Sequence, residues 1–216
     1  MSGTFLTFEG LDGSGKTTQL RLLADALARR GFDVLTTREP GGTLLGKRIR
    51  ELILEIEDAP APLAELLLFA ADRAQHLETL IRPALDAGKI VISDRYADAT
   101  TAYQGAGRGF PAEKIRNTIE LATGNFKPDL TLFFDLPTEK ALARANSRAE
   151  ELNRLDKETI DFFDRVRSAY LEISAAEPER FLVVDANGSI EEIHLKTLRV
   201  VTEFLESKNK SQNRER

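Results

Sequence analysis

The feature that most constrains this fold is the segment GLDGSGKT at residues 10–17, which follows an apolar run and precedes a helical pattern. It matches the pattern Gly-x-x-x-x-Gly-Lys-Ser/Thr at every fixed position. Glycines let the backbone turn tightly, so that successive N–H groups point inward at anionic oxygens. The start of the following helix adds positive potential at the same place. The segment therefore predicts a strand, a phosphate-binding loop and a helix, in that order.

Five short β-rich runs alternate with helix-length segments along the chain. Their apolar, β-branched and aromatic residues are typical of strands buried on both faces. This alternation predicts an α/β fold, in which right-handed crossovers place helices on both faces of a parallel sheet. The runs are 4–9, 33–37, 89–94, 130–135 and 180–185, and the expected helices are 17–30, 63–85, 112–122, one after Pro137, 156–176 and 189–205.

The composition is that of one globular domain. The chain has 216 residues, of which 42% are hydrophobic and 30% charged, enough apolar residues for a real core. No linker long enough to separate two domains is visible, so we place a single domain at 1–207. We expect the polar tail at 208–216 to be disordered.

Charge and cysteine content narrow the class of protein. A formal net charge of −5 argues against coating of a nucleic-acid polymer, which needs a basic face. The absence of cysteine excludes disulfides and thiolate metal sites and fits a reducing compartment, so we expect a cytoplasmic location. No uncharged apolar stretch approaches 18 residues and no signal peptide is visible, so we expect no membrane partner.

The loop residues suit a nucleoside triphosphate with Mg²⁺. Lys16 can reach the β- and γ-phosphates, and the hydroxyl of Thr17 can ligate the ion. Asp94, at the end of an apolar run, is suited to hold a water bound to the same ion. A GTPase would add an Asn-Lys-x-Asp guanine reader, which is absent, so a small kinase is the better interpretation. We assign ATP to Gly10, Leu11, Asp12, Gly13, Ser14, Gly15, Lys16, Thr17 and Thr18.

Two segments are candidates for the phosphoryl acceptor site. In TTREPGGT (36–43), Arg38 ends a predicted strand, where ligands bind in open α/β sheets, and Pro40 begins a sharp turn. A surface arginine before a turn is an equally good interpretation. In LLLFAADRAQH (66–76), Phe69 and Arg73 can stack a flat base and hydrogen-bond its carbonyl. Spacing alone favours a Phe69 packed inward and a solvated Arg73, with His76 on the helix surface.

Two further patterns complete this interpretation. We expect a core stripe along the same helix, formed by Leu63, Leu67, Ala70, Ala74, Leu77 and Ile81. In SDRYADATTAYQGAGRG (93–109), Arg95 can clamp a phosphate with two hydrogen bonds. If the chain is helical after Tyr96, then Thr100, Tyr103 and Gln104 share a face that suits a base and a sugar better than a core.

These segments resemble the bacterial thymidylate kinase family, closely and along most of the chain. The resemblance implies a P-loop NTPase-type three-layer sandwich with sheet order 2-3-1-4-5, a mobile lid at about 143–156, and a homodimer. It also implies transfer of the γ-phosphoryl group of MgATP to dTMP, giving dTDP. The matching segments are FEGLDGSGKTTQ, TTREPGGT, LLLFAADRAQH, SDRYADATTAYQGAGRG, PDLTLFFDLP and DFFDRVRSAYLE.

The resemblance also implies roles for individual residues. The dTMP site would comprise Asp12, Arg38, Pro40, Phe69, Arg73, Arg95, Thr100, Tyr103 and Gln104. Asp12 would meet the 3′-OH, Phe69 would stack on thymine and Arg73 would bond its O4. Arg38 and Arg95 would hold the acceptor phosphate, Thr100 and Gln104 would lie by the base edge, and Tyr103 would disfavour a ribose. Two positions depart from the usual pattern: Ala99, where Ser is common, and NRLD at 153–156 in place of Asp-Arg-Ile-Glu.

Catalysis needs a further cation, which the variable positions of the loop do not supply. Some family members carry an arginine inside the loop, whereas the variable positions here read Leu-Asp-Gly-Ser. The segment ARANSRAEELNR (143–154) resembles the lid of members whose catalytic arginine lies there. We assign Arg148 to the γ-phosphate and Arg144 to the adenine side. With Lys16, Asp94 and Arg95, Arg148 completes the catalytic set that we expect.

Two alternatives stay open. The first is a nucleoside-monophosphate kinase that acts on dUMP or on a guanylate. The second is a nucleotide-gated regulator that binds ATP without productive transfer. The acceptor-side arginines argue against a regulator, because a switch needs no second pocket for an anion and a base.

Overall fold

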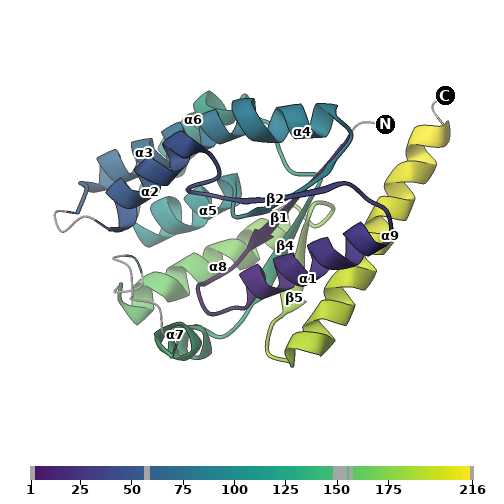
Figure 1. Cartoon of the computed structure of the whole chain (residues 1–216). Coiled ribbons are helices and arrows are strands. Elements are labelled where there is room, and N and C mark those ends of the chain that lie inside the picture. Colours follow the sequence, from purple (N-terminus) through teal and green to yellow (C-terminus); the bar gives the residue numbers. More distant parts are fainter. Residues whose placement is uncertain (1–2, 56–58, 148–154, 156–157, 215–216) are drawn as a thin grey trace.

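The computed structural model describes residues 3–55, 59–147, 155 and 158–214. A five-stranded parallel sheet in the order β2-β3-β1-β4-β5 forms its centre (Figure 1). This confirms the expected α/β fold and strand order. The strands are β1 (Thr4–Glu9), β2 (Val34–Arg38), β3 (Ile90–Asp94), β4 (Leu130–Asp135) and β5 (Phe181–Asp185).

Helices surround this sheet. They are α1 (Lys16–Arg29), α2 (Leu44–Leu54), α3 (Pro62–His76), the π-helical turn η1 (Leu77–Ile81), α4 (Arg82–Asp86), α5 (Ala97–Thr100), the π-helical turn η2 (Thr101–Gly107), α6 (Ala112–Thr123), α7 (Thr138–Asn146), α8 (Ile160–Ala176) and α9 (Ile190–Arg214). We expected a disordered tail from residue 208, whereas α9 continues to Arg214. Across the described ranges, no helix is long and apolar enough to cross a membrane.

The two faces of the sheet are covered by different helices. Helix α1 packs against β1, β2, β3 and α9, and its residues Leu20, Leu23 and Leu27 are buried, as their spacing predicts. Because side chains alternate along a strand, Phe5 and Leu6 of β1 point to opposite faces. Leu6 joins the cluster that contains the α1 leucines, whereas Phe5 joins the one formed with η1 and α4. The sheet is therefore the middle of three layers.

The helix expected over 63–85 is divided by the π-helical turn η1. Pro83 lies at the start of α4 and has no N–H to donate, and its ring excludes an ordinary α-helical turn before it. A wider turn accommodates this proline without ending the helical run. The expected core stripe is wrong at its first two positions, because Leu63 and Leu67 are 48% and 54% exposed. The buried side of α3 carries polar residues instead, which apolar periodicity cannot reveal.

Helix α2 was not predicted. Its N-cap is Thr43, whose hydroxyl oxygen accepts a 2.9 Å hydrogen bond from the backbone N–H of Gly46. Ile49 and Ile53 are buried at helical spacing. A threonine before a pair of apolar residues four apart is a usable signal for such a helix. This helix matters because it brings Arg50 to the site.

Candidate active site

Three glycines shape the phosphate-binding loop. Gly10, Gly13 and Gly15 have φ angles of 146°, 87° and 88°, in the region that side-chain-bearing residues rarely adopt. A Cβ atom on Gly13 would collide with the backbone carbonyl of Ala141 in α7, so the loop also needs glycine there for close packing. Gly15 is the N-cap of α1. The loop thus combines turning backbone and a helix N-terminus, the two elements of an anion site.

Lys16 is held beside the loop by a carboxylate. Its Nζ lies 2.8 Å from Oδ1 of Asp12 and 3.5 Å from the carbonyl oxygen of Leu11, and the side chain is buried. A lysine in this position is a compact charge directed into the loop. Asp12 and Lys16, both assigned to the ATP site, are thus in direct contact.

Asp12 also binds a cation from the acceptor side. Nη2 of Arg95 donates to the same Oδ1 over 3.0 Å. Burial opposes the ionisation of Asp12, but the charges of Lys16 and Arg95 outweigh it and hold the pKa of Asp12 well below its usual value. One carboxylate thus joins the loop lysine to the arginine that follows β3.

The backbone at Arg95 is left-handed, with φ at 75°. Its N–H donates to the carbonyl of Phe8 over 2.9 Å, and its carbonyl accepts from the hydroxyl of Ser93 over 2.7 Å. The guanidinium lies 4.7 Å from the ring centroid of Tyr103. Backbone and side chain are therefore both fixed, and the guanidinium is directed at the phosphate loop.

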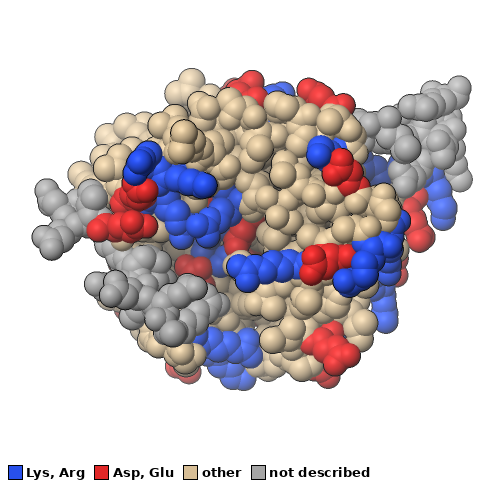
Figure 2. Space-filling view, viewed as in Figure 1, with Lys and Arg blue, Asp and Glu red and all other residues tan. Residues whose placement is uncertain are grey.

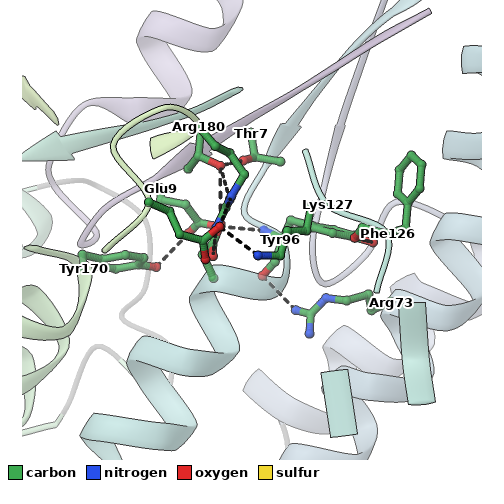
Figure 3. Close-up of polar contacts among 11 residues, drawn as sticks. Thr7, Glu9, Arg73, Tyr96, Phe126, Lys127, Tyr170 and Arg180 are labelled. Carbon is green, nitrogen blue, oxygen red and sulfur yellow. Dashed lines mark hydrogen bonds and ion pairs between the residues drawn. The ribbon is translucent and has the colours of Figure 1, made fainter. Parts of the chain in front are cut away.

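Glu9 accepts a hydrogen bond from the backbone of Tyr96, the residue that follows Arg95. Figure 3 shows its carboxyl group between Tyr96 and Tyr170, with Oε1 accepting from the N–H of Tyr96 at 2.8 Å and Oε2 from the hydroxyl of Tyr170 at 2.7 Å. The carbonyl of Tyr96 in turn accepts from Nη2 of Arg73 at 2.9 Å. Burial, and then the negative charge of Asp98, raise the pKa of Glu9 to about 8. Glu9 was not singled out from the sequence, although a glutamate ending an apolar strand was a visible signal.

The two residues expected at the magnesium site, Thr17 and Asp94, lie in contact. The hydroxyl of Thr17 donates a 2.6 Å hydrogen bond to Oδ2 of Asp94. Within the described part of the chain, no group of three or more His, Cys, Asp or Glu residues could hold a metal ion. Mg²⁺ commonly binds through one or two protein oxygens, with water and substrate phosphates completing its shell, and this pair fits that mode.

Arg73 is buried, and the expectation of a solvated side chain is wrong. It donates to Oε2 of Glu39 over 2.8 Å and to the hydroxyl of Thr100 over 2.7 Å. His76 is also buried rather than on the helix surface. Its Nδ1 lies 2.9 Å from Oε1 of Glu39 and its Nε2 lies 2.7 Å from the hydroxyl of Thr37. Glu39 therefore holds both basic side chains of α3, and its pairing with Arg73 compensates the burial of the guanidinium charge.

The residues expected around the base come from three elements, α3, α5 and η2. Phe69 is half-buried and belongs to neither hydrophobic cluster, so the inward-packed alternative is wrong. Thr100 and Gln104 are buried in α5 and η2, and Thr100 accepts a hydrogen bond from Arg73. Tyr103 lies under Arg95. These contacts bring together the two segments that carry the acceptor-site residues.

Arg38 and Arg50 add positive charge beside this region. Arg38 is exposed and pairs in register with Asp94 at the carboxyl end of the sheet. Nη1 of Arg50 donates to the carbonyl of Pro40 over 3.2 Å. Burial, and then the charge of Arg38, lower the pKa of Arg50. Both side chains lie beside Gly41, where an added Cβ atom would be 3.3 Å from Cδ of Arg50 and 3.8 Å from Nε of Arg38. Figure 2 shows basic and acidic side chains gathered around a recess on this face of the molecule. Arg50 was missed with the rest of α2.

Comparison with known proteins identifies the family. A model of the thymidylate kinase family matches residues 8–197. The chain belongs to the thymidylate kinase family. The thymidylate kinase of Synechococcus sp. (strain JA-2-3B'a(2-13)) is 50% identical to it over 197 residues, which cover 91% of this chain and 93% of that protein.

Other thymidylate kinases are similar over most of their length. That of Syntrophotalea carbinolica is 48% identical over 195 residues, covering 88% of this chain and 90% of its own. The crystal structure of thymidylate kinase from Ehrlichia chaffeensis has a TM-score of 0.77 and 35% identity, covering 94% of this chain and 100% of that one.

Part of the lid expected at about 143–156 falls outside the residues that the structure describes. Arg148 and most of the NRLD segment fall outside the described residues. Arg144, in α7, is exposed and its Nη1 donates to the carbonyl of Ala186, just after β5, over 3.3 Å. Ala99, where family members often have Ser, is buried in the apolar core.

Proposed function

We propose that this chain phosphorylates dTMP to dTDP with the γ-phosphoryl group of MgATP, as a dTMP kinase that serves dTTP synthesis. The observation that carries this proposal is the position of Asp12, whose carboxylate contacts both Lys16 of the phosphate loop and Arg95 of the acceptor side. A group held by one cation is thus within reach of the other. Phosphoryl transfer requires this proximity between donor and acceptor.

The chemistry is mainly charge stabilisation and alignment. Lys16, Arg95 and Arg148 stabilise the transferred group, whose negative charge is spread over its equatorial oxygens. Thr17 and Asp94 would hold Mg²⁺, Asp94 through a bound water, and the ion would neutralise negative charge on the phosphates. The acceptor is an anionic phosphate already, so no general base is needed.

We propose that the acceptor pocket contacts both the base and the 5′-phosphate of dTMP. Phe69 stacks on thymine and Arg73, fixed by Glu39, donates to its O4. Arg38, Arg50 and Arg95 hold the 5′-phosphate. The burial and hydrogen bonds of Arg73 support this assignment, because a guanidinium with a fixed position can discriminate between base edges.

Product analysis separates this function from that of a regulator. With MgATP and dTMP, we expect ADP and dTDP to form in equal amounts, and ADP formation to stop when dTMP is omitted. A nucleotide-gated regulator would instead turn over ATP slowly and indifferently to dTMP. That outcome would refute the proposal.

We also propose a homodimer and a cytoplasmic location. The exposed leucines Leu63 and Leu67 belong to α3, and α3 packs against α6, which carries Leu121 at 88% exposure. Exposed apolar side chains grouped on neighbouring helices are typical of an interface. Sedimentation should give twice the mass of the chain, and Leu67→Glu should shift it toward the monomer. A wild-type chain that sediments as a monomer would contradict the dimer.

A further inference from the structure

A buried carboxylate stands next to the proposed base pocket without a role in the chemistry described above. Glu65 lies on α3 at spacings of four and eight residues from Phe69 and Arg73, and its side chain is 1% exposed. Residues at these spacings lie on one face of a helix. Glu65 therefore faces the same side of α3 as the two residues assigned to the base.

Arg108 pairs with Glu65 at two points. Its Nε lies 3.2 Å from Oε1 and its Nη2 lies 3.2 Å from Oε2 of Glu65. Nη1 of Arg108 donates to Glu158 over 2.6 Å, and the guanidinium lies 5.0 Å from the ring centroid of Phe162. Arginine only donates, so both oxygens of Glu65 act as acceptors toward it.

This pairing dictates which way the amide of Gln104 points. Gln104 is 2% exposed, and its Nε2 donates to Oε1 of Glu65 over 3.0 Å. Because the carboxylate accepts, only the NH₂ end of the amide can face it. The carbonyl end is turned away from Glu65, and no residue in the described part of the chain donates a hydrogen bond to it.

We propose that Glu65, held by Arg108, is a positioning residue that sets pyrimidine specificity through Gln104. This inference rests on the proposed function, in which Gln104 lies at the base edge. Thymine carries a donor at N3–H, which a fixed carbonyl oxygen accepts. Cytosine has a lone pair at N3, which repels that oxygen. The buried pair thus favours dTMP over dCMP by fixing an acceptor rather than a donor at this edge.

Glu65→Gln is the direct test, because it keeps the shape but not the carboxylate. Its carbonyl can accept from Arg108, which leaves its NH₂ to donate to Gln104 and lets the Gln104 amide turn over. We expect kcat/KM for dTMP to fall, that for dCMP to rise, and their ratio to drop by about tenfold or more, since an unmatched buried polar group is strongly rejected. Glu78→Gln is the matched control, because Glu78 is exposed and pairs with Arg82 on the same helical run.

The outcomes separate the inference from the function. If Glu65→Gln lowers kcat/KM equally for dTMP and dCMP, Glu65 is only structural support and the inference is wrong. If Glu65→Gln does not fold, Arg108→Lys decides, because it keeps the charge but loses the two-point contact. A reduced dTMP/dCMP ratio in Arg108→Lys supports the inference and an unchanged ratio overturns it. A wild-type chain that ignores dTMP would refute the proposed function itself.

Discussion

Nη2 of Arg95 lies 3.0 Å from Oδ1 of Asp12, the same oxygen that contacts Lys16. The segment after β3 and the loop after β1 are therefore joined by a carboxylate with two cationic partners. Both segments begin at the carboxyl ends of neighbouring strands, where open α/β sheets bind ligands. This contact places the acceptor-side arginine against the phosphate loop.

Arg50→Gln should weaken the acceptor site. Hydrogen bonds to charged groups contribute about 1.5–3 kcal/mol, so we expect kcat/KM for dTMP to fall roughly 10- to 100-fold. The KM for ATP should change little, because Arg50 lies on the acceptor side. Steady-state kinetics with each substrate varied in turn would measure both effects.

The control is Arg48→Gln in the same helix. Arg48 is exposed and forms an ion pair with Glu51 on the same helix. Near-normal kinetics are expected for it. Equal losses in the two variants would mean that Arg50 acts through the stability of α2 and does not bind the acceptor.

Asp94→Asn should raise the magnesium requirement. The amide keeps the size of the side chain but lacks the negative charge that favours Mg²⁺. We expect the Mg²⁺ concentration for half-maximal activity to rise by at least about tenfold, and excess chelator to abolish activity in the wild type. Turnover that survives the chelator would contradict a magnesium-dependent reaction.

Arg148→Ala should remove the cation that we expect the lid to supply, because the variable positions of the phosphate loop contain no basic residue. By analogy with arginine fingers, we expect kcat to fall roughly 10³-fold while the melting temperature stays unchanged. Arg21→Ala, on the exposed side of α1, serves as a surface control. Normal turnover by the Arg148 variant would exclude it from the mechanism.

Glu9 should make the free energy of unfolding depend on pH. Its pKa is about 8 in the folded chain against an ordinary 4.5. Between these values the folded state keeps a proton that the unfolded state has released, so this group's contribution to stability declines as pH rises through the window. The expected slope is about 1.4 kcal/mol per pH unit at most.

Glu9→Gln cannot titrate but can still accept from Tyr96. Denaturant unfolding at about pH 6 and about pH 8 should therefore show a smaller loss of stability in this variant than in the wild type. Parallel losses in the two proteins would show that Glu9 is not the group that titrates.

The sequence predicted the sheet well because burial on both faces leaves uninterrupted apolar runs, as at 130–135. It also located the phosphate loop, because the residues of that motif lie close together in the sequence, at 10–17. It placed Leu63 and Leu67 in the core because apolar periodicity shows an amphipathic helix but not which partner covers it. Their exposure depends on how α2 and α6 pack against α3, which the sequence pattern of α3 alone does not show.

Polar residues of the site were harder to predict. Arg73 and His76 are buried because Glu39, more than thirty residues earlier, accepts hydrogen bonds from both. No local sequence pattern indicates a hydrogen bond between residues this far apart in the chain. Glu9 likewise acquires its position from a partner that is adjacent only in the fold, because the N–H of Tyr96 that it binds is 87 residues away in the chain.

A nucleotide panel tests the central claim most directly. ADP release from MgATP would be measured with dTMP, dUMP, dCMP and dGMP as competing acceptors. A site in which Phe69 stacks a pyrimidine and Arg73 donates to its O4 predicts the highest kcat/KM for dTMP. Faster phosphorylation of dGMP, or ADP release that no nucleotide stimulates, would contradict it.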